Sequence, residues 1–135
     1  MAEEMSKPMP ALKRYDSIRE LLLDKDLASL GDSYVNFVYS LAMSQKSGRP
    51  LGAKVSNQVL ARAVEISKLR RLLPHRVDRH ARGNAAEALL VFAWLQGILE
   101  MDECIKALSQ KDPAEAFTVL LRQILDKLGV FNEHK

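Results

Sequence analysis

The chain has 135 residues, of which 47% are hydrophobic and 27% are charged. This length predicts one domain that buries about two-thirds of its unfolded surface and needs no disulfides. The single cysteine, Cys104, cannot pair within the chain, and no apolar segment precedes a cleavage site, so we expect a cytoplasmic protein. No run approaches the roughly 18 uncharged apolar residues of a spanning helix, which argues against a membrane protein. The net charge of +3 mildly favours an anionic partner.

The order of apolar and polar residues predicts an all-α domain of six to seven helices. Residues 1–10 contain two prolines and no periodicity, which predicts a flexible N-terminal segment ahead of one domain over residues 11–135. Apolar residues then recur at helical spacing, without the period-two alternation of a strand. The predicted helices cover residues 12–23, 27–45, 54–72, 84–99, 102–109 and 113–128.

The helices predicted at 27–45 and 84–99 are apolar around most of their circumference, with Leu30 and Phe37 contributing to the first of them. Such helices belong in the interior, so we expect these two to pack against each other at the centre of the domain. The clearest local signal marks the last helix, where Asp112 precedes Pro113 and Gly129 follows the final apolar residue. These are an N-cap, a favoured first helical residue and a C-terminal stop.

Two acidic residues interrupt the central helices. Asp32 lies in the nearly apolar run 27–40, and Glu87 lies in the apolar run 85–95. We expect both carboxylates to be buried, where an ionised group needs a cation, hydrogen bonds or a metal ion. Gly31 and the alanines around Glu87 would let the two helices approach closely. The sequence therefore predicts a Mg²⁺ site between the helices, although arginines in the core would satisfy the same two acids.

Positive charge is concentrated in residues 62–82, where seven Lys or Arg residues stand against two acids. Clusters of this kind bind the phosphates of nucleic acids, and an RNA duplex is recognised largely through its shape and backbone. The candidate phosphate contacts are Arg70, Arg71, Arg76, Arg79 and Arg82. A solvated helix end, whose cations offset the helix dipole, would explain the same cluster.

Three segments resemble motifs of the ribonuclease III family, and they occur in the family's order. LGDSYVNFVYS, residues 30–40, resembles the signature helix of the family. KVSNQVLARAVEISKL, residues 54–69, is similar to the helix that follows it, and NAAEALLVFAWLQG, residues 84–97, is similar to the third motif. The resemblance implies the helical fold of the family's endonuclease domain, in its stand-alone type, which is Mini-III-like or archaeal.

The family's metal site contains four acids, and this sequence retains two of them. The family has a Glu one turn before the signature Asp, that Asp, an Asp at the head of the third motif and a Glu three residues later. In this chain those places hold Ala28, Asp32, Asn84 and Glu87. The Mini-III branch also looks to have an alanine at the first place. The resemblance implies that Asp32 and Glu87 are catalytic and hold Mg²⁺ or Mn²⁺, with Asn84 as a candidate third ligand.

The resemblance also implies a function. It predicts a homodimeric endoribonuclease that hydrolyses phosphodiester bonds of double-stranded or structured RNA, with ribosomal RNA precursors as one candidate substrate. Two alternatives stay open. Ala28 and Asn84 favour a catalytically inactive RNA-binding dimer in RNA-particle or ribosome assembly. A helical interaction module without any nucleic-acid role is the other.

Overall fold

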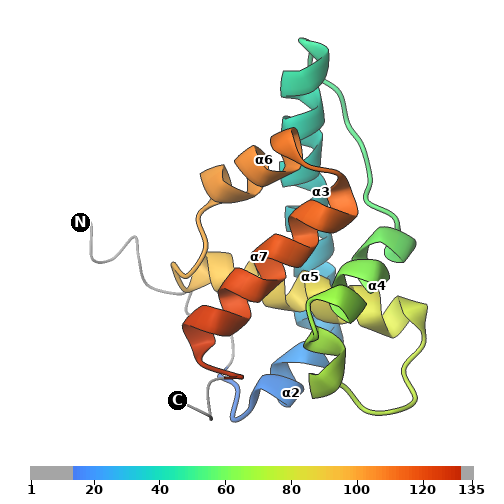
Figure 1. Cartoon of the computed structure of the whole chain (residues 1–135), viewed down its shortest axis with the longest axis vertical. Coiled ribbons are helices and arrows are strands. Elements are labelled where there is room, and N and C mark those ends of the chain that lie inside the picture. The colour runs from blue at the N-terminus through green and yellow to red at the C-terminus, as the bar shows by residue number, and fades with distance from the viewer. Residues whose placement is uncertain (1–13, 132–135) are drawn as a thin grey trace.

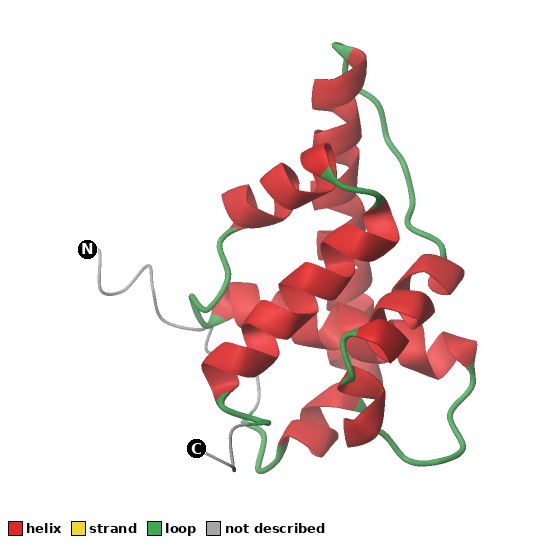
Figure 2. Cartoon of the chain, viewed as in Figure 1, coloured by secondary structure: helices red, strands yellow, loops and turns green. Residues whose placement is uncertain are grey.

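The computed structural model describes residues 14–131, and every regular element in that range is helical (Figures 1 and 2). These residues form six α-helices and one 3₁₀ helix, which confirms the predicted all-α class. The elements are α2 (Ile18–Leu22), α3 (Lys25–Ser47), α4 (Asn57–Ile66), η1 (Leu69–Leu72), α5 (Arg79–Leu95), α6 (Met101–Gln110) and α7 (Pro113–Leu128). The segment 1–10 lies outside the described residues. None of the described helices is both long enough and apolar enough to cross a membrane.

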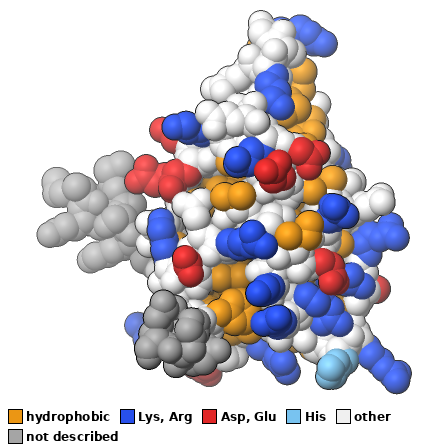
Figure 3. All heavy atoms as spheres, viewed as in Figure 1, with side chains coloured by type: hydrophobic (Ala, Val, Ile, Leu, Met, Phe, Trp, Pro, Cys, Tyr) orange, Lys and Arg blue, Asp and Glu red, His pale blue; other side chains and the backbone are white. Residues whose placement is uncertain are grey.

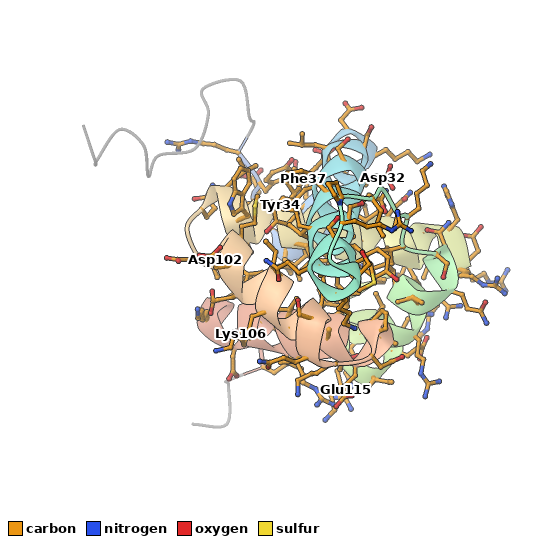
Figure 4. The ribbon with its side chains drawn as sticks, turned by 90° about the horizontal axis from the view of Figure 1, so that it is seen from above. Asp32, Tyr34, Phe37, Asp102, Lys106 and Glu115 are labelled. Atoms are coloured by element: carbon orange, nitrogen blue, oxygen red, sulfur yellow. The ribbon has the colours of Figure 1, made fainter. Side chains whose placement is uncertain are left out.

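Helix α5 lies at the centre of the domain, as its composition predicts. It runs between α3 on one side and α4 with α7 on the other, so helices cover it from both directions (Figures 1 and 4). Its residues 85–91 are all buried. Large buried side chains, among them Phe117 and Leu120 of α7, belong to the same hydrophobic core as these α5 residues. The predicted packing of the two apolar helices against each other is therefore confirmed.

Helix boundaries differ from the predicted ones where a polar cap was not recognised. The first predicted helix, 12–23, is observed in the described residues as the five-residue helix α2, because the Ser17 hydroxyl accepts a hydrogen bond from the Glu20 amide and starts the helix there. Helix α5 begins at Arg79, ahead of the predicted residue 84, because Asp78 accepts from the amide of Ala81 at 2.8 Å. Part of the basic segment is consequently helical.

The predicted helix 54–72 is interrupted. Helix α4 ends at Ile66, and Lys68 adopts a left-handed conformation with φ of 74° before the chain continues as η1. A residue in that conformation cannot continue an α-helix, so a single long helix over this range is wrong. By contrast, the caps predicted for α7 are confirmed, since Asp112 accepts from the Glu115 amide and Gly129 has φ of 71°.

The connection from α3 to α4 is pinned along α3 by a row of polar side chains. Three side chains spaced four residues apart on the helix accept hydrogen bonds from three backbone amides spaced two residues apart on the connection. Four helical residues rise about 6 Å and two extended residues about 6.6 Å, so the two spacings match. The pairs are Ser44 Oγ with Leu51 N (3.0 Å), Ser40 Oγ with Ala53 N (2.8 Å) and Asn36 Oδ1 with Val55 N (2.8 Å).

Candidate functional site

Asp32 of α3 and Glu87 of α5 come together where the two helices cross. Gly31 marks the crossing, because a Cβ built on it would lie 2.5 Å from the carbonyl carbon of Glu87 and closer still to its oxygen. Any larger residue would force the two backbones apart. The expectation that small residues allow this close approach is confirmed, and the crossing brings the two predicted acids to one place.

The two carboxylates differ in their exposure to solvent. Glu87 is only 5% exposed, as expected for an acid in an apolar helix. Asp32 is exposed, so the expectation that it is buried is wrong. Gly31 and Val35 face the core on the apolar side of α3, whereas Asp32 points outward (Figure 4). The candidate site therefore lies at the protein surface, where the Glu87 carboxylate is buried and the Asp32 carboxylate is exposed to solvent.

The electrostatics of this pair favour a shared proton. Burial removes the Glu87 carboxylate from water and, together with a hydrogen bond to Asp32 and the negative charge of Asp32, raises the pKa of Glu87 to about 8. Two adjacent carboxylates repel each other when both are ionised, and a proton or a cation relieves that repulsion. At neutral pH and without a cation, Glu87 is therefore mostly protonated.

This raised pKa predicts how stability depends on pH. Between the unfolded value of 4.5 and the folded value of about 8, the native protein keeps a proton that the unfolded chain has lost. Stability therefore falls as pH rises, by roughly 4 kcal/mol from pH 5 to 9 in EDTA. Urea unfolding at a series of pH values measures this slope. Glu87→Gln lacks the titrating group and should flatten it, and identical slopes for the two proteins would contradict the assignment.

Asn36 belongs to the site, although sequence reasoning missed it. Its Nδ2 donates to Asp32 Oδ1 at 3.1 Å, while its Oδ1 accepts from the Val55 amide at 2.8 Å. The side chain is thus fixed at one end by the backbone of the α3–α4 connection and holds the Asp32 carboxylate at the other. Its position four residues after Asp32 on the same helix was the signal that could have identified it.

The two places where the family has further acids provide no carboxylate here. Ala28 is buried at 3% exposure. Asn84 is half-buried, one turn before Glu87 on α5, and lines a small pocket with Asp24 and Lys25. Within residues 14–131 there is no group of three or more His, Cys, Asp or Glu side chains that could hold a metal ion. Asp32 and Glu87 are thus the acids that this crossing supplies.

The five candidate arginines do not form one uniform surface. Arg82 Nη1 lies 2.9 Å from a Glu65 carboxylate oxygen, and Arg70 Nε lies 3.9 Å from the same oxygen. The Arg70 guanidinium also donates to the carbonyl oxygens of Pro74 and His75 at 2.9 and 2.6 Å. These two arginines therefore hold the segment between α4 and α5 together. The exposed members are Arg71, Arg76 and Arg79.

Comparison with known proteins assigns the chain to a family. The family model described as Ribonuclease III matches residues 25–130, which is more than half of the chain. The chain belongs to the ribonuclease III family. The all-helical arrangement fits the family's endonuclease domain. Family membership implies an RNA-processing, nuclease-type function with RNA binding, and ribonuclease III proteins generally use divalent metal ions. A search of curated proteins gave no match.

Proposed function

We propose that this ribonuclease III family protein is a metal-dependent endoribonuclease that hydrolyses phosphodiester bonds in double-stranded or structured RNA. The observation that supports this most strongly is the meeting of Asp32 and Glu87 at the crossing of α3 and α5. An interaction module without nuclease chemistry gains nothing from two repelling carboxylates at a helix crossing, one of them buried. Neither carboxylate has an arginine as a hydrogen-bonded or ion-paired partner among residues 14–131.

The chemistry of the two acids fits Mg²⁺ or Mn²⁺. Mg²⁺ is held through one or two protein carboxylates and keeps several waters, so a pair of acids is a sufficient protein contribution. Asp32 and Glu87 would hold the ion, and Asn84 offers an amide oxygen one turn before Glu87 on α5. When bound, such an ion activates a water and polarises the scissile phosphate. Asn36 orients Asp32 for this role through its bond to the carboxylate.

Exposed cations next to α5 would bind the RNA backbone. Arg79 lies in the first turn of the helix that carries Glu87, and Arg76 lies in the segment just before it. Contacts of this kind neutralise phosphates without reading bases, which suits recognition of an A-form duplex. Arg70 and Arg82 would act indirectly, because their contacts with Glu65 hold this segment in place. Arg71 lies in η1, before this segment, and lines a pocket together with residues of α7.

An exposed apolar strip on α3 supports a homodimer. Leu30 is 42% exposed and Phe37 is 54% exposed, so the prediction that this apolar helix is interior around most of its circumference is wrong for these two residues. They are seven residues apart and so share a face of α3. Tyr34 lies between these two residues in the sequence of α3. Trp94 of α5, which is 39% exposed, stacks on the Tyr34 ring with the ring centroids 5.2 Å apart. A second copy covering this strip would put two Asp32–Glu87 pairs in one assembly, one for each RNA strand.

The dimer is tested by placing a charge in the strip. Phe37→Glu is expected to convert the dimer to a monomer, because burying an unpaired carboxylate in an interface is costly. Sedimentation velocity measures the state. Ile66→Glu, at a residue of α4 with 41% exposure, introduces the same charge elsewhere and should leave the dimer intact. A wild-type protein that sediments as a monomer at the concentration of the cleavage assay would contradict the proposal.

The nuclease function is tested with purified protein and a labelled RNA duplex. Cleavage is expected in Mg²⁺ or Mn²⁺ and should stop in EDTA, whereas single-stranded RNA of the same sequence should be cut far more slowly. Absence of strand scission under all metal conditions would refute it. The alternative, a catalytically inactive RNA-binding dimer, is favoured by Ala28 and Asn84 at two acid positions. It predicts salt-sensitive duplex binding that is indifferent to Mg²⁺ and never leads to cleavage.

A further inference from the structure

A second basic site lies between α7 and the junction of α4 with η1. An open pocket of about 660 Å³ is formed there by residues from two separate parts of the chain, 67–71 and 119–131. Pockets of several hundred Å³ are typical of small-ligand sites. Its lining residues are Ser67, Lys68 and Arg71 from the junction, Val119, Arg122, Gln123, Leu125 and Asp126 from α7, and Phe131 after it.

This pocket lies away from the Asp32–Glu87 pair. In Figure 4, Asp32 and Phe37 point to one side of the molecule, whereas α7, marked by Glu115, forms the opposite side. Figure 3 shows the face that α7 crosses, where Lys and Arg side chains lie beside an apolar area on its lower half. The candidate nuclease site and this pocket therefore cannot share one phosphate group.

The charges around the pocket favour an anion. Three cations line it, namely Lys68, Arg71 and Arg122, against the single acid Asp126. Within residues 14–131, neither Lys68 nor Arg71 forms an ion pair. Arg122 Nη2 donates to the Ile66 carbonyl oxygen at 3.0 Å, which both satisfies the C-terminal end of α4 and holds the guanidinium beside the pocket. Cations arranged in this way bind phosphate oxygens through charge-assisted hydrogen bonds.

The backbone at Lys68 gives independent support. It has φ of 74°, and it is the one non-glycine residue with positive φ among those that the structure describes. Glycine or asparagine avoids the steric cost of this conformation, which lysine does not. Strained residues of this kind cluster at functional sites, because the side chain is then needed where the strain puts it. At Lys68 that position is the wall of the pocket.

Besides Ser67 and Gln123, the remaining lining residues are apolar, and they narrow the class of anion that the pocket would bind. Val119, Leu125 and Phe131 present hydrocarbon and an aromatic ring beside the three cations. Inorganic phosphate would leave this surface unused, whereas a nucleotide carries a planar base next to its phosphate, and bases stack on aromatic side chains. We propose that this pocket binds a nucleotide unit, free or within an RNA strand, with its phosphate at Lys68, Arg71 and Arg122 and its base against Val119 and Phe131.

The test uses binding rather than cleavage, so it is independent of the proposed nuclease function. Amide chemical shifts of the ¹⁵N-labelled full chain are followed in EDTA during titration with 5′-AMP and, separately, with a short 5′-phosphorylated single-stranded RNA. Both ligands are expected to shift the amides of residues 67–71 and 119–126. Shifts there with RNA alone identify a strand as the source, and shifts with AMP alone identify a free nucleotide.

Matched variants separate a built site from general attraction. Lys68→Gln/Arg71→Gln removes two charges at the pocket, and Lys46→Gln/Arg49→Gln removes two exposed charges at the far end of α3. The pocket variant should bind about tenfold or more weakly, and the control within about twofold of wild type. Lys68→Gly removes one charge while relieving the backbone, so it keeps the fold and should also weaken binding. Equal weakening by the control, or no shifts at these residues with either ligand, would overturn the proposal.

Discussion

Glu87→Gln is expected to reduce RNA duplex cleavage by about a thousandfold or more, and Asp32→Asn by a similar factor. Each change keeps the size of the side chain but removes a negative charge that the metal ion needs. For Glu87 the new amide also remains in the buried position of a group that is 5% exposed, so solvent cannot replace the lost ligand. A thousandfold change corresponds to about 4 kcal/mol of transition-state stabilisation. Single-turnover cleavage of a labelled duplex in Mg²⁺ measures it.

Two measurements show whether this loss is chemical. Duplex binding in EDTA should be unchanged in both variants, because the phosphate contacts are made by cations elsewhere on the surface. Asp102→Asn is the matched control, since Asp102 is an exposed acid at the start of α6 and far from Asp32 (Figure 4). It should cut at the wild-type rate. Cleavage by Glu87→Gln or Asp32→Asn at the rate of this control would exclude the pair from catalysis.

Gly31→Ala is expected to destabilise the protein by roughly 3 kcal/mol or more. The added methyl group would meet the backbone of Glu87, with the carbonyl carbon at 2.5 Å, and a backbone cannot rotate away as a side chain can. Helices α3 and α5 would have to separate at the centre of the core, where close packing leaves no room for adjustment. The same separation moves Asp32 away from Glu87, so activity should fall even in molecules that remain folded.

Urea unfolding of Gly31→Ala against Gly52→Ala measures this effect. Gly52 lies in the α3–α4 connection, where an added Cβ would have nothing within 4 Å and φ is not in the left-handed region, so its replacement should be nearly neutral or slightly stabilising. Similar unfolding midpoints for the two variants would mean that the helices can part at little cost. In that case the close crossing would not be what positions the two acids.

Several features of this protein could be predicted from local sequence because their causes are local. The caps of α7 depend on Asp112 and Gly129 themselves, and the apolar character of α3 and α5 is sufficient to predict that they are central. Glu87 could be predicted for the same reason, since a carboxylate in a buried apolar run needs a partner, whereas the same argument wrongly predicted that Asp32 is buried. Lys68 was missed because nothing in its type favours positive φ, and only its surroundings impose that conformation.

The sequence by itself determined the all-helical class and the central pair of helices, and it indicated the two candidate acids; the tertiary structure decided which surfaces those helices cover. A helical pattern tells which residues share a face, but the burial of that face depends on another helix lying over it. Glu87 is buried because α3 crosses it at Gly31. Asp32 stays exposed on one flank of α3, and Leu30 and Phe37 stay exposed on the other, because the described helices pack on the face between those flanks. Likewise, Arg70 and Arg82 differ from the other three candidate arginines because, within residues 14–131, the fold brings these two to the Glu65 carboxylate.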